Sequence, residues 1–535
     1  MRVGLGRAQE TRSTDLSRRG FAMRRAAGRV QSLKVGSAAQ LLPVVAGYGI
    51  QLLTTPYVLG RLGLHDFGIW SITGAIAQYG ALFDLGVSRA ANRYVALFHV
   101  RGDDKGDSRV VGTCIVTLSG LWIILSGLAF AASGVVDTAL GTHDPVLARN
   151  LILYAVAILI VGLVARVLAA ASVGRGRMVP AGIAIAILST LQACGGVVAL
   201  AVSPSLPLFA AGTLIGTVAG LAVVVAIILA DERRIHVAVP TIPLAGELIA
   251  YGVKSQVAAA GDMLLLQSGK LIAGIMIGPA AAGIWELASR LATGAQVLGA
   301  ASAAALTPHL TRTFIVSGMD GIINEYEHLT RRNTAVAVMA PSLMAATATT
   351  LIPFWLGGGH GQVVAVLCAL LPGVAINLST AVSSSTLMAI GRPAVIAYVT
   401  VAGGVFQTAL AVSMAYAWGF VGIGVAFAIG VPIAKFAGQW FMQRSAAIPM
   451  RLYLRGAAGP YVAAAASACA AWPVGLLAHP YDRESAAWPF LASAAIFCSV
   501  YLSVGWGRDY LPRITLRRQG SDMAKEEKGR HRAAE

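Results

Sequence analysis

The sequence contains one turn pattern twice, as Leu62-Gly63-x4-Gly68-Ile69-Trp70 and, 215 residues later, as Ile277-Gly278-x4-Gly283-Ile284-Trp285. Each copy joins two long apolar segments. A further pair of dipeptides, Gly176-Arg177 and Gly391-Arg392, has the same offset. A shared offset indicates internal duplication rather than coincidence in a glycine-rich chain. Duplication within an apolar chain is typical of membrane transporters.

The composition excludes a soluble protein. Of 535 residues, 56% are hydrophobic and 12% are charged, and the mean hydropathy is +0.71. A helix needs about 20 apolar residues to cross the hydrocarbon layer. The sequence therefore predicts an all-α polytopic membrane protein with about 14 transmembrane helices. The predicted spans are 35–59, 67–87, 111–136, 150–173, 179–202, 208–230, 249–277, 284–310, 334–357, 363–390, 396–418, 421–443, 459–478 and 488–506.

The repeat divides these spans into two parallel six-helix halves. Six crossings return the chain to its starting side, so both Gly-x4-Gly-Ile-Trp turns lie on the same face of the membrane. Two additional helices follow the second half. The predicted segments are a basic N-terminal extension 1–34, a first half 35–232, a second half 245–445, helices 13 and 14 within 456–506, and a basic tail 507–535.

The 41 Lys and Arg residues, which give a net charge of +17, are unevenly distributed. With both termini in the cytoplasm, 33 lie in cytoplasmic segments and only Arg61, Arg149 and Arg483 lie in outer loops. This asymmetry follows the positive-inside rule. The charge therefore indicates membrane topology rather than a nucleic-acid partner. Because Ala, Gly and Arg are abundant, we expect a bacterial cytoplasmic membrane.

Eight ionisable residues fall inside predicted spans. Inserting one such residue into the membrane costs about 2.5–3.5 kcal/mol. Each residue is therefore expected to be paired, to contact water or to serve a function. Cations outnumber anions by two. The eight residues are Asp84, Arg166, Lys254, Asp262, Lys270, Glu286, Arg290 and Lys435.

The span 249–277 carries the most polar residues. At about 100° per residue, its polar side chains fall within an arc of roughly 140°, which predicts a water-exposed face. We expect a cationic cavity between the halves in which Lys270, Arg290 and Arg166 contact an anionic substrate. The alternative is that these residues only form ion pairs that hold the bundle together. The expected polar residues of this face are Ser255, Gln256, Asp262, Gln267 and Lys270.

Glu286 and Arg290 have the i, i+4 spacing and order that favour a helical ion pair. They are either a simple structural pair or a pair that breaks and reforms as an outer gate opens, and Asp262 or Glu286 could also carry a coupling proton. Ser268-Gly269-Lys270 lacks the remaining residues of a phosphate-binding loop, which argues against ATP hydrolysis. The loops are too short to form a catalytic domain. We therefore predict no catalytic residue, cofactor or metal, and no enzyme activity.

The chain resembles the polysaccharide transporter (oligosaccharide flippase) family of the multidrug/oligosaccharidyl-lipid/polysaccharide exporter superfamily. The resemblance rests on the two turns, on LFDLGVSRAANRYVA (82–96), on GIWELASRLA (283–292), on Gly391-Arg392-Pro393 and on GFVGIGVA (419–426). These motifs also have a structural interpretation, because Gly permits chain reversal and Trp favours the membrane interface. The break at Gly419 depends on glycines alone.

The resemblance implies alternating-access translocation of a polyprenyl-diphosphate-linked oligosaccharide from the cytoplasmic to the outer leaflet. The implied partners are this substrate, membrane lipids, and a glycan polymerase or glycosyltransferases. One alternative is a cation-coupled multidrug exporter of the same superfamily, although such exporters usually have twelve helices. Another is a scaffold for glycan assembly that transports nothing. Fourteen helices and the cationic excess favour the flippase.

Overall fold

The computed structural model describes residues 46–79, 87–131, 144–232, 238–239, 242–300, 303, 306–478, 480 and 482–507. This part of the chain contains α-helices and no strand, as the sequence predicts. The predicted N-terminal extension, nearly all of the predicted tail, and Asp84 lie outside the described residues.

Residues 46–79 are helical and bend at Gly63, whose φ of 75° lies in the left-handed region. The later helices are α2 (Val87–Val100), α3 (Asp104–Ala131), α5 (Pro145–Gly174), α6 (Met178–Val202), α7 (Leu206–Glu232), α8 (Ile242–Met276), α9 (Pro279–Ala300), α10 (Leu306–Leu356), α11 (Gly361–Ser379), α12 (Ala381–Ala389), α13 (Pro393–Ser445), α14 (Met450–Ala478) and α15 (Arg483–Gly507).

Each of the fourteen predicted spans is mainly helical over the residues that the structure describes. Two of them divide between consecutive helices: 284–310 between α9 and α10, and 363–390 between α11 and α12. The least certain break, at Gly419, is confirmed. Backbone angles at Trp418 and Gly419 leave the helical region, so α13 consists of two arms joined by a tight turn. Glycine is needed at this turn because Gly419 has a φ of 59°.

Nine helical segments in the described residues are long and apolar enough to cross a membrane. Residues 46–79, α8 and α9 are not among these nine. These are the segments that carry the polar residues of the candidate site, including Thr55, Ser71, Lys270 and Glu286. A membrane helix can be this polar only where it faces protein or water rather than lipid.

Two segments that the sequence predicts to be loops are helical. Helix α2 buries Val87, Ala90, Ala91 and Val95, which share one face at i, i+3, i+4 and i+8 spacing. Helix α10 begins at Leu306 and continues into the next span, with a bend at Gly318. The sequence predicts both segments as loops for the same reason. Amphipathic helices at the ends of membrane spans are too polar for their hydropathy to identify them as helices.

The backbone repeats as the sequence predicts. Gly63 and Gly278 both have positive φ, at 75° and 132°, and so do Gly176 and Gly391, at 85° and 76°. Each pair is separated by the 215-residue offset of the turn pattern. Duplication is therefore retained in chain conformation as well as in sequence.

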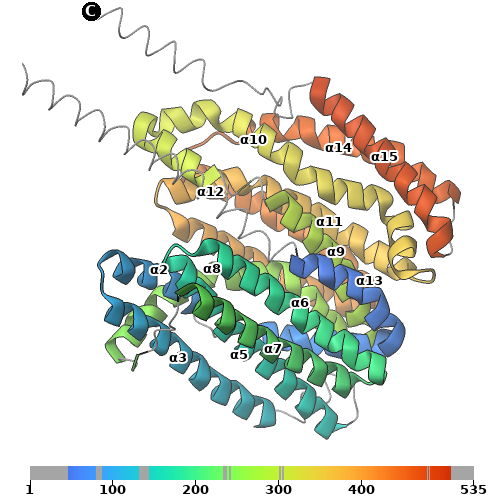
Figure 1. Ribbon diagram of the computed structural model, residues 1–535. Helices are drawn as coiled ribbons and strands as arrows, with labels where there is room; N and C mark the ends of the chain where they lie inside the picture. The colour runs from blue at the N-terminus through green and yellow to red at the C-terminus, as the bar shows by residue number, and fades with distance from the viewer. Residues whose placement is uncertain are drawn as a thin grey trace, which may run out of the picture.

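The helices form two groups that lie side by side, with an additional pair at one edge (Figure 1). Helices α2, α3, α5, α6 and α7 pack mainly among themselves, while α8 to α13 form the second group. Helices α14 and α15 pack on α10 and on each other. This matches two six-helix repeats followed by two peripheral helices.

The two turns pack directly against each other and define what we call the turn end of the bundle. A Cβ atom on Gly68 would lie 1.8 Å from the carbonyl oxygen of Pro279. A Cβ atom on Gly283 would lie 2.9 Å from the carbonyl oxygen of Leu64. The repeated glycines therefore permit close backbone contact between the halves.

The tryptophans of the turns do not both occupy the membrane interface that the sequence predicts. Trp285 is fully buried, with its ring centroid 4.8 Å from that of Phe427 on α13. Trp70 packs edge-on against Phe209 of α7, at 5.3 Å. Each indole thus packs within its own half. Burial is possible because Gly269 of α8 has no side chain where the Trp285 ring lies.

Replacing Gly68 with alanine should destabilise the protein by about 1–3 kcal/mol, because the added methyl group collides with the Pro279 backbone. Gly74→Ala is the control, since nothing lies within 4 Å of a Cβ atom there. Thermal unfolding of both variants in detergent measures the difference. Equal melting temperatures would show that the turns do not pack this closely.

Candidate functional site

One carboxylate near the turn end holds two cations. Lys270 Nζ of α8 lies 2.9 Å from Glu286 Oε2, and Arg290 Nε of α9 lies 2.9 Å from Glu286 Oε1. The three side chains are between 9% and 14% exposed. Both oxygens of Glu286 are therefore used, and all three ionic groups belong to the second half.

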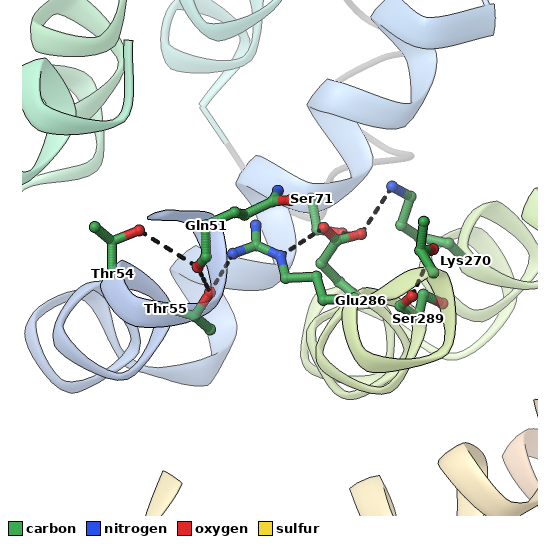
Figure 2. A network of polar contacts seen from close by, with 9 residues as sticks. Gln51, Thr54, Thr55, Ser71, Lys270, Glu286 and Ser289 are labelled. Carbon is green, nitrogen blue, oxygen red and sulfur yellow. Dashed lines mark hydrogen bonds and ion pairs between the residues drawn. The ribbon is translucent and has the colours of Figure 1, made fainter. Parts of the chain in front are cut away.

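Contacts from this cluster cross to the first half (Figure 2). Arg290 Nη1 donates to the Thr55 hydroxyl, and the Ser71 hydroxyl donates to Glu286 Oε2 at 3.4 Å. The Arg290 guanidinium also lies over the Phe67 ring, 5.1 Å from its centroid. Arg290 thus touches Thr55 and Phe67 of the first half while paired with Glu286 of the second.

The hydroxyl of Thr55 is oriented to accept. Its hydrogen is donated to the carbonyl oxygen of Gln51, which leaves an oxygen lone pair for Arg290. Figure 2 shows Gln51 and Thr55 on one helix of the first half facing the cluster, while Thr54 lies on the other side of Gln51. Nearby, Trp355 Nε1 of α10 donates to the carbonyl oxygen of Leu52 at 2.8 Å. The interface at the turn end is therefore hydrogen-bonded at several points.

The cluster lies across equivalent positions of the two repeats. Ser71 and Glu286 are 215 residues apart, and so are Thr55 and Lys270. The first repeat supplies neutral hydroxyls where the second supplies charged groups. The duplicated positions have thus diverged chemically, and one of the two pairs, Ser71 and Glu286, is in direct contact.

The cluster has an excess of positive charge. Lys270 and Arg290 share the single carboxylate of Glu286, which leaves one positive charge uncompensated within this cluster. Such a group is costly at membrane depth unless water or an anion neutralises it. The geometry can therefore bind an anion at the contact between the halves.

Asp262 and Lys435 form a second ion pair. Lys435 Nζ of α13 lies 3.3 Å from Asp262 Oδ1 of α8, with Lys435 9% and Asp262 51% exposed. The pair lies inside the second half and is neutral. Asp262 and Lys270 therefore have separate partners, as expected, but both partners are in their own half rather than across the interface.

The other predicted residues lie apart from the cluster. Arg166 is exposed on α5, and Gln256 is half-buried. Gln267 lines a small cavity of about 30 Å³ with Ser289 and Thr293, which has room for a water molecule. The side chains of Lys254 and Ser255 lie outside the described part. A role for these residues in substrate binding stays a prediction.

Sequence reasoning missed the partners in the first half, Thr55, Phe67 and Ser71. Hydroxyl-bearing residues are common in membrane helices, so the residue type alone does not identify a functional position. The repeat offset could have found two of them, because it aligns Ser71 with Glu286 and Thr55 with Lys270.

Solved structures with this arrangement are membrane transport proteins. The lipid II flippase MurJ in an inward closed conformation aligns with a TM-score of 0.67 at 15% identity, over 89% of this chain and 99% of that chain. An inward-facing multidrug resistance MATE family transporter aligns with a TM-score of 0.62 at 15% identity, over 76% and 94%. A transporter of the same superfamily from Pyrococcus furiosus aligns at 0.53 and 17% identity, over 78% and 96%. At these identities the likeness shows the fold.

The chain is a multi-pass membrane protein that shares its fold with the flippase and the multidrug transporter. Residues 34–314, more than half of the chain, match the family described as polysaccharide biosynthesis protein. The chain belongs to this family. No curated protein is significantly similar to it in sequence.

Replacing Glu286 with glutamine should destabilise the protein by about 3–5 kcal/mol, because two nearly buried cations lose their only shared counter-ion. Glu327→Gln is the control, since its pair with Arg331 is about one-third exposed and contributes about 1 kcal/mol or less. Unfolding by detergent titration measures both. A Glu286→Gln variant as stable as the control would contradict the assigned ion pairs.

Proposed function

We propose that this protein is a flippase that moves a polyprenyl-diphosphate-linked oligosaccharide from the cytoplasmic to the outer leaflet of a bacterial cytoplasmic membrane. The substrate would serve the synthesis of a cell-envelope polysaccharide. Two independent facts support this proposal: membership of the polysaccharide biosynthesis family, and a fold shared with a lipid II flippase.

The observation that carries the proposal is the excess cation between the halves. A diphosphate attracts guanidinium and ammonium groups through charge-assisted hydrogen bonds. Lys270 and Arg290 have one carboxylate between them, so an arriving diphosphate could compete with Glu286 for either cation. Arg166, which is exposed on α5, is a further candidate contact.

The contacts at the turn end suggest how a gate opens there. The ion pairs of Glu286 lie within the second half, so they can survive separation of the halves. The contacts of this cluster that must break are the Ser71 and Thr55 hydrogen bonds and the Phe67 contact, together with the neighbouring Trp355–Leu52 hydrogen bond. This favours a gate in which the Glu286–Arg290 pair moves as a unit, over the alternative in which the pair breaks and reforms.

The positive-inside distribution of charge supports an orientation with the turn end outward and both termini in the cytoplasm. An inside-negative membrane potential would then favour outward movement of an anionic substrate, by about 2.3 kcal/mol per charge per 100 mV. Asp262 is paired with Lys435, and a role for Asp262 as a carrier of a coupling proton stays a prediction.

A multidrug exporter is the second candidate, because exporters of the same fold align over most of their length. A glycan-assembly scaffold is the third. The exporter predicts loss of drug efflux on deletion, and the scaffold predicts that the cation cluster is dispensable.

Deleting the gene should accumulate lipid-linked oligosaccharide on the cytoplasmic leaflet, and the wild-type protein should restore export. Lys270→Ala, expressed at the wild-type level, should reduce export at least tenfold, because an anion-binding cation is removed. Arg312→Ala, which changes an exposed arginine of α10, should export normally. Leaflet-specific labelling of the glycan measures all three.

Different results would support the other candidates. Normal export by the deletion strain together with reduced dye efflux would establish an exporter. Export lost on deletion but fully restored by Lys270→Ala would contradict the proposed site and favour the scaffold.

Joining the halves at the turn end should stop transport. Leu52→Cys with Trp355→Cys places one thiol in each half, where the native residues are hydrogen-bonded. A short bifunctional methanethiosulfonate reagent should then abolish export, and a reducing agent should restore it. The five native cysteines are first replaced by serine or alanine.

Phe354→Cys with Phe490→Cys is the matched control, since these stacked rings join α10 to α15 without crossing between the halves. The cross-linked control should transport normally. Undiminished export by the cross-linked Leu52/Trp355 variant would refute a gate at the turn end.

A further inference from the structure

The two arms of α13 form an apolar groove on the surface of the second half. Its volume is about 480 Å³, within the usual range of about 300–1,000 Å³ for small-molecule sites. The groove occupies the part of each arm that lies farthest from the Gly419 turn. Its lining includes Tyr398, Ala402, Phe406, Ile433, Ala437 and Phe441.

Two exposed arginines lie at the end of the groove remote from the turn end. Arg392 immediately precedes the first arm, and its Nη1 donates to the carbonyl oxygen of Ser445 at 2.7 Å. Arg444 lies three residues beyond Phe441, with its guanidinium over the Trp440 ring, 5.4 Å from the centroid. A guanidinium has five N–H donors, so both side chains retain donors for another ligand.

No acidic residue competes for these arginines nearby in sequence. The chain contains no Asp or Glu between Glu327 and Asp482, an interval that includes the whole of α13. The exposed rings of Tyr398 and Trp440 lie along the same arms. These features match a lipid molecule in order. The apolar groove fits an acyl chain, the aromatic side chains fit the interfacial region, and the basic groups at one end fit a charged head group.

We propose that this groove binds an anionic phospholipid, with one acyl chain between the arms of α13 and the phosphate on Arg392 and Arg444. In a bilayer, apolar contact alone cannot select a ligand, because lipid tails surround every exposed helix. Selection must therefore come from the head group. Two exposed arginines at one end of an apolar groove favour a negatively charged head group.

The position of the groove favours a membrane phospholipid over the transported substrate. Glu286 and its partners lie at the turn end, whereas the groove lies near the other ends of the α13 arms. On the side of the arms toward α8, Gly404 packs against Leu264. The groove is therefore separate from the cation cluster, and the proposed lipid site does not depend on the identity of the transported substrate.

Purified full-length protein in nanodiscs tests the proposal. With fluorescent phosphatidylglycerol and phosphatidylcholine as probes, the wild-type protein should retain the anionic lipid preferentially. Arg392→Gln with Arg444→Gln should weaken phosphatidylglycerol retention at least fivefold. Arg101→Gln with Arg109→Gln, which changes two exposed arginines of the first half, should leave it unchanged.

A second variant tests the acyl site. Ala402→Trp fills the groove and should also reduce retention, whereas Ala417→Trp, at an exposed position of the same arm near the turn, should not. Equal retention of both lipids by the wild-type protein would overturn the proposal. Displacement of the lipid by undecaprenyl phosphate would also overturn it, because the groove would then bind a carrier lipid. A dimer that Ala402→Trp abolishes would overturn it as well, because the groove would then bind a second copy of the chain.

Discussion

The shared carboxylate of Glu286 is the interaction on which the centre of this protein depends. It lies between Lys270 and Arg290 at 2.9 Å from each, in a position with little access to water. Without it, two cations would remain nearly buried at the contact between the halves. With it, Arg290 is held where it also reaches Thr55 and Phe67 of the first half. One acid therefore stabilises the second half and connects it to the first.

The strength of these contacts differs by location. The ion pairs of the Glu286 cluster lie inside the second half. The contacts that join this cluster and the neighbouring Trp355 to the first half are hydrogen bonds that involve a hydroxyl or carbonyl group, and one ring contact. Such an interface can separate at modest cost, because no ion pair between residues that the structure describes joins the two halves. The close approach of Gly68 to Pro279 adds packing without adding charge. Such a boundary suits a protein whose halves move relative to each other.

Much of the fold could be predicted from the sequence. Apolar length alone located the helices, and the glycines alone located the break at Gly419. The helix α2 and the first part of α10 were missed because amphipathic surface helices are not apolar enough to read as spans. Trp285 was wrongly expected at the interface, because sequence cannot show that Gly269 leaves room for an indole ring.

The sequence by itself determined the repeat, the all-helical fold class and the turn at Gly419, and it predicted which ionisable residues lie in apolar spans. Hydropathy, glycine position and charge are local properties of the chain, so they can be read without coordinates. Only the tertiary structure decided the partners: Lys270 with Glu286, Asp262 with Lys435, and Arg290 with Thr55. Two of these pairs join residues more than 170 positions apart, and such contacts depend on how helices pack, which no local pattern specifies.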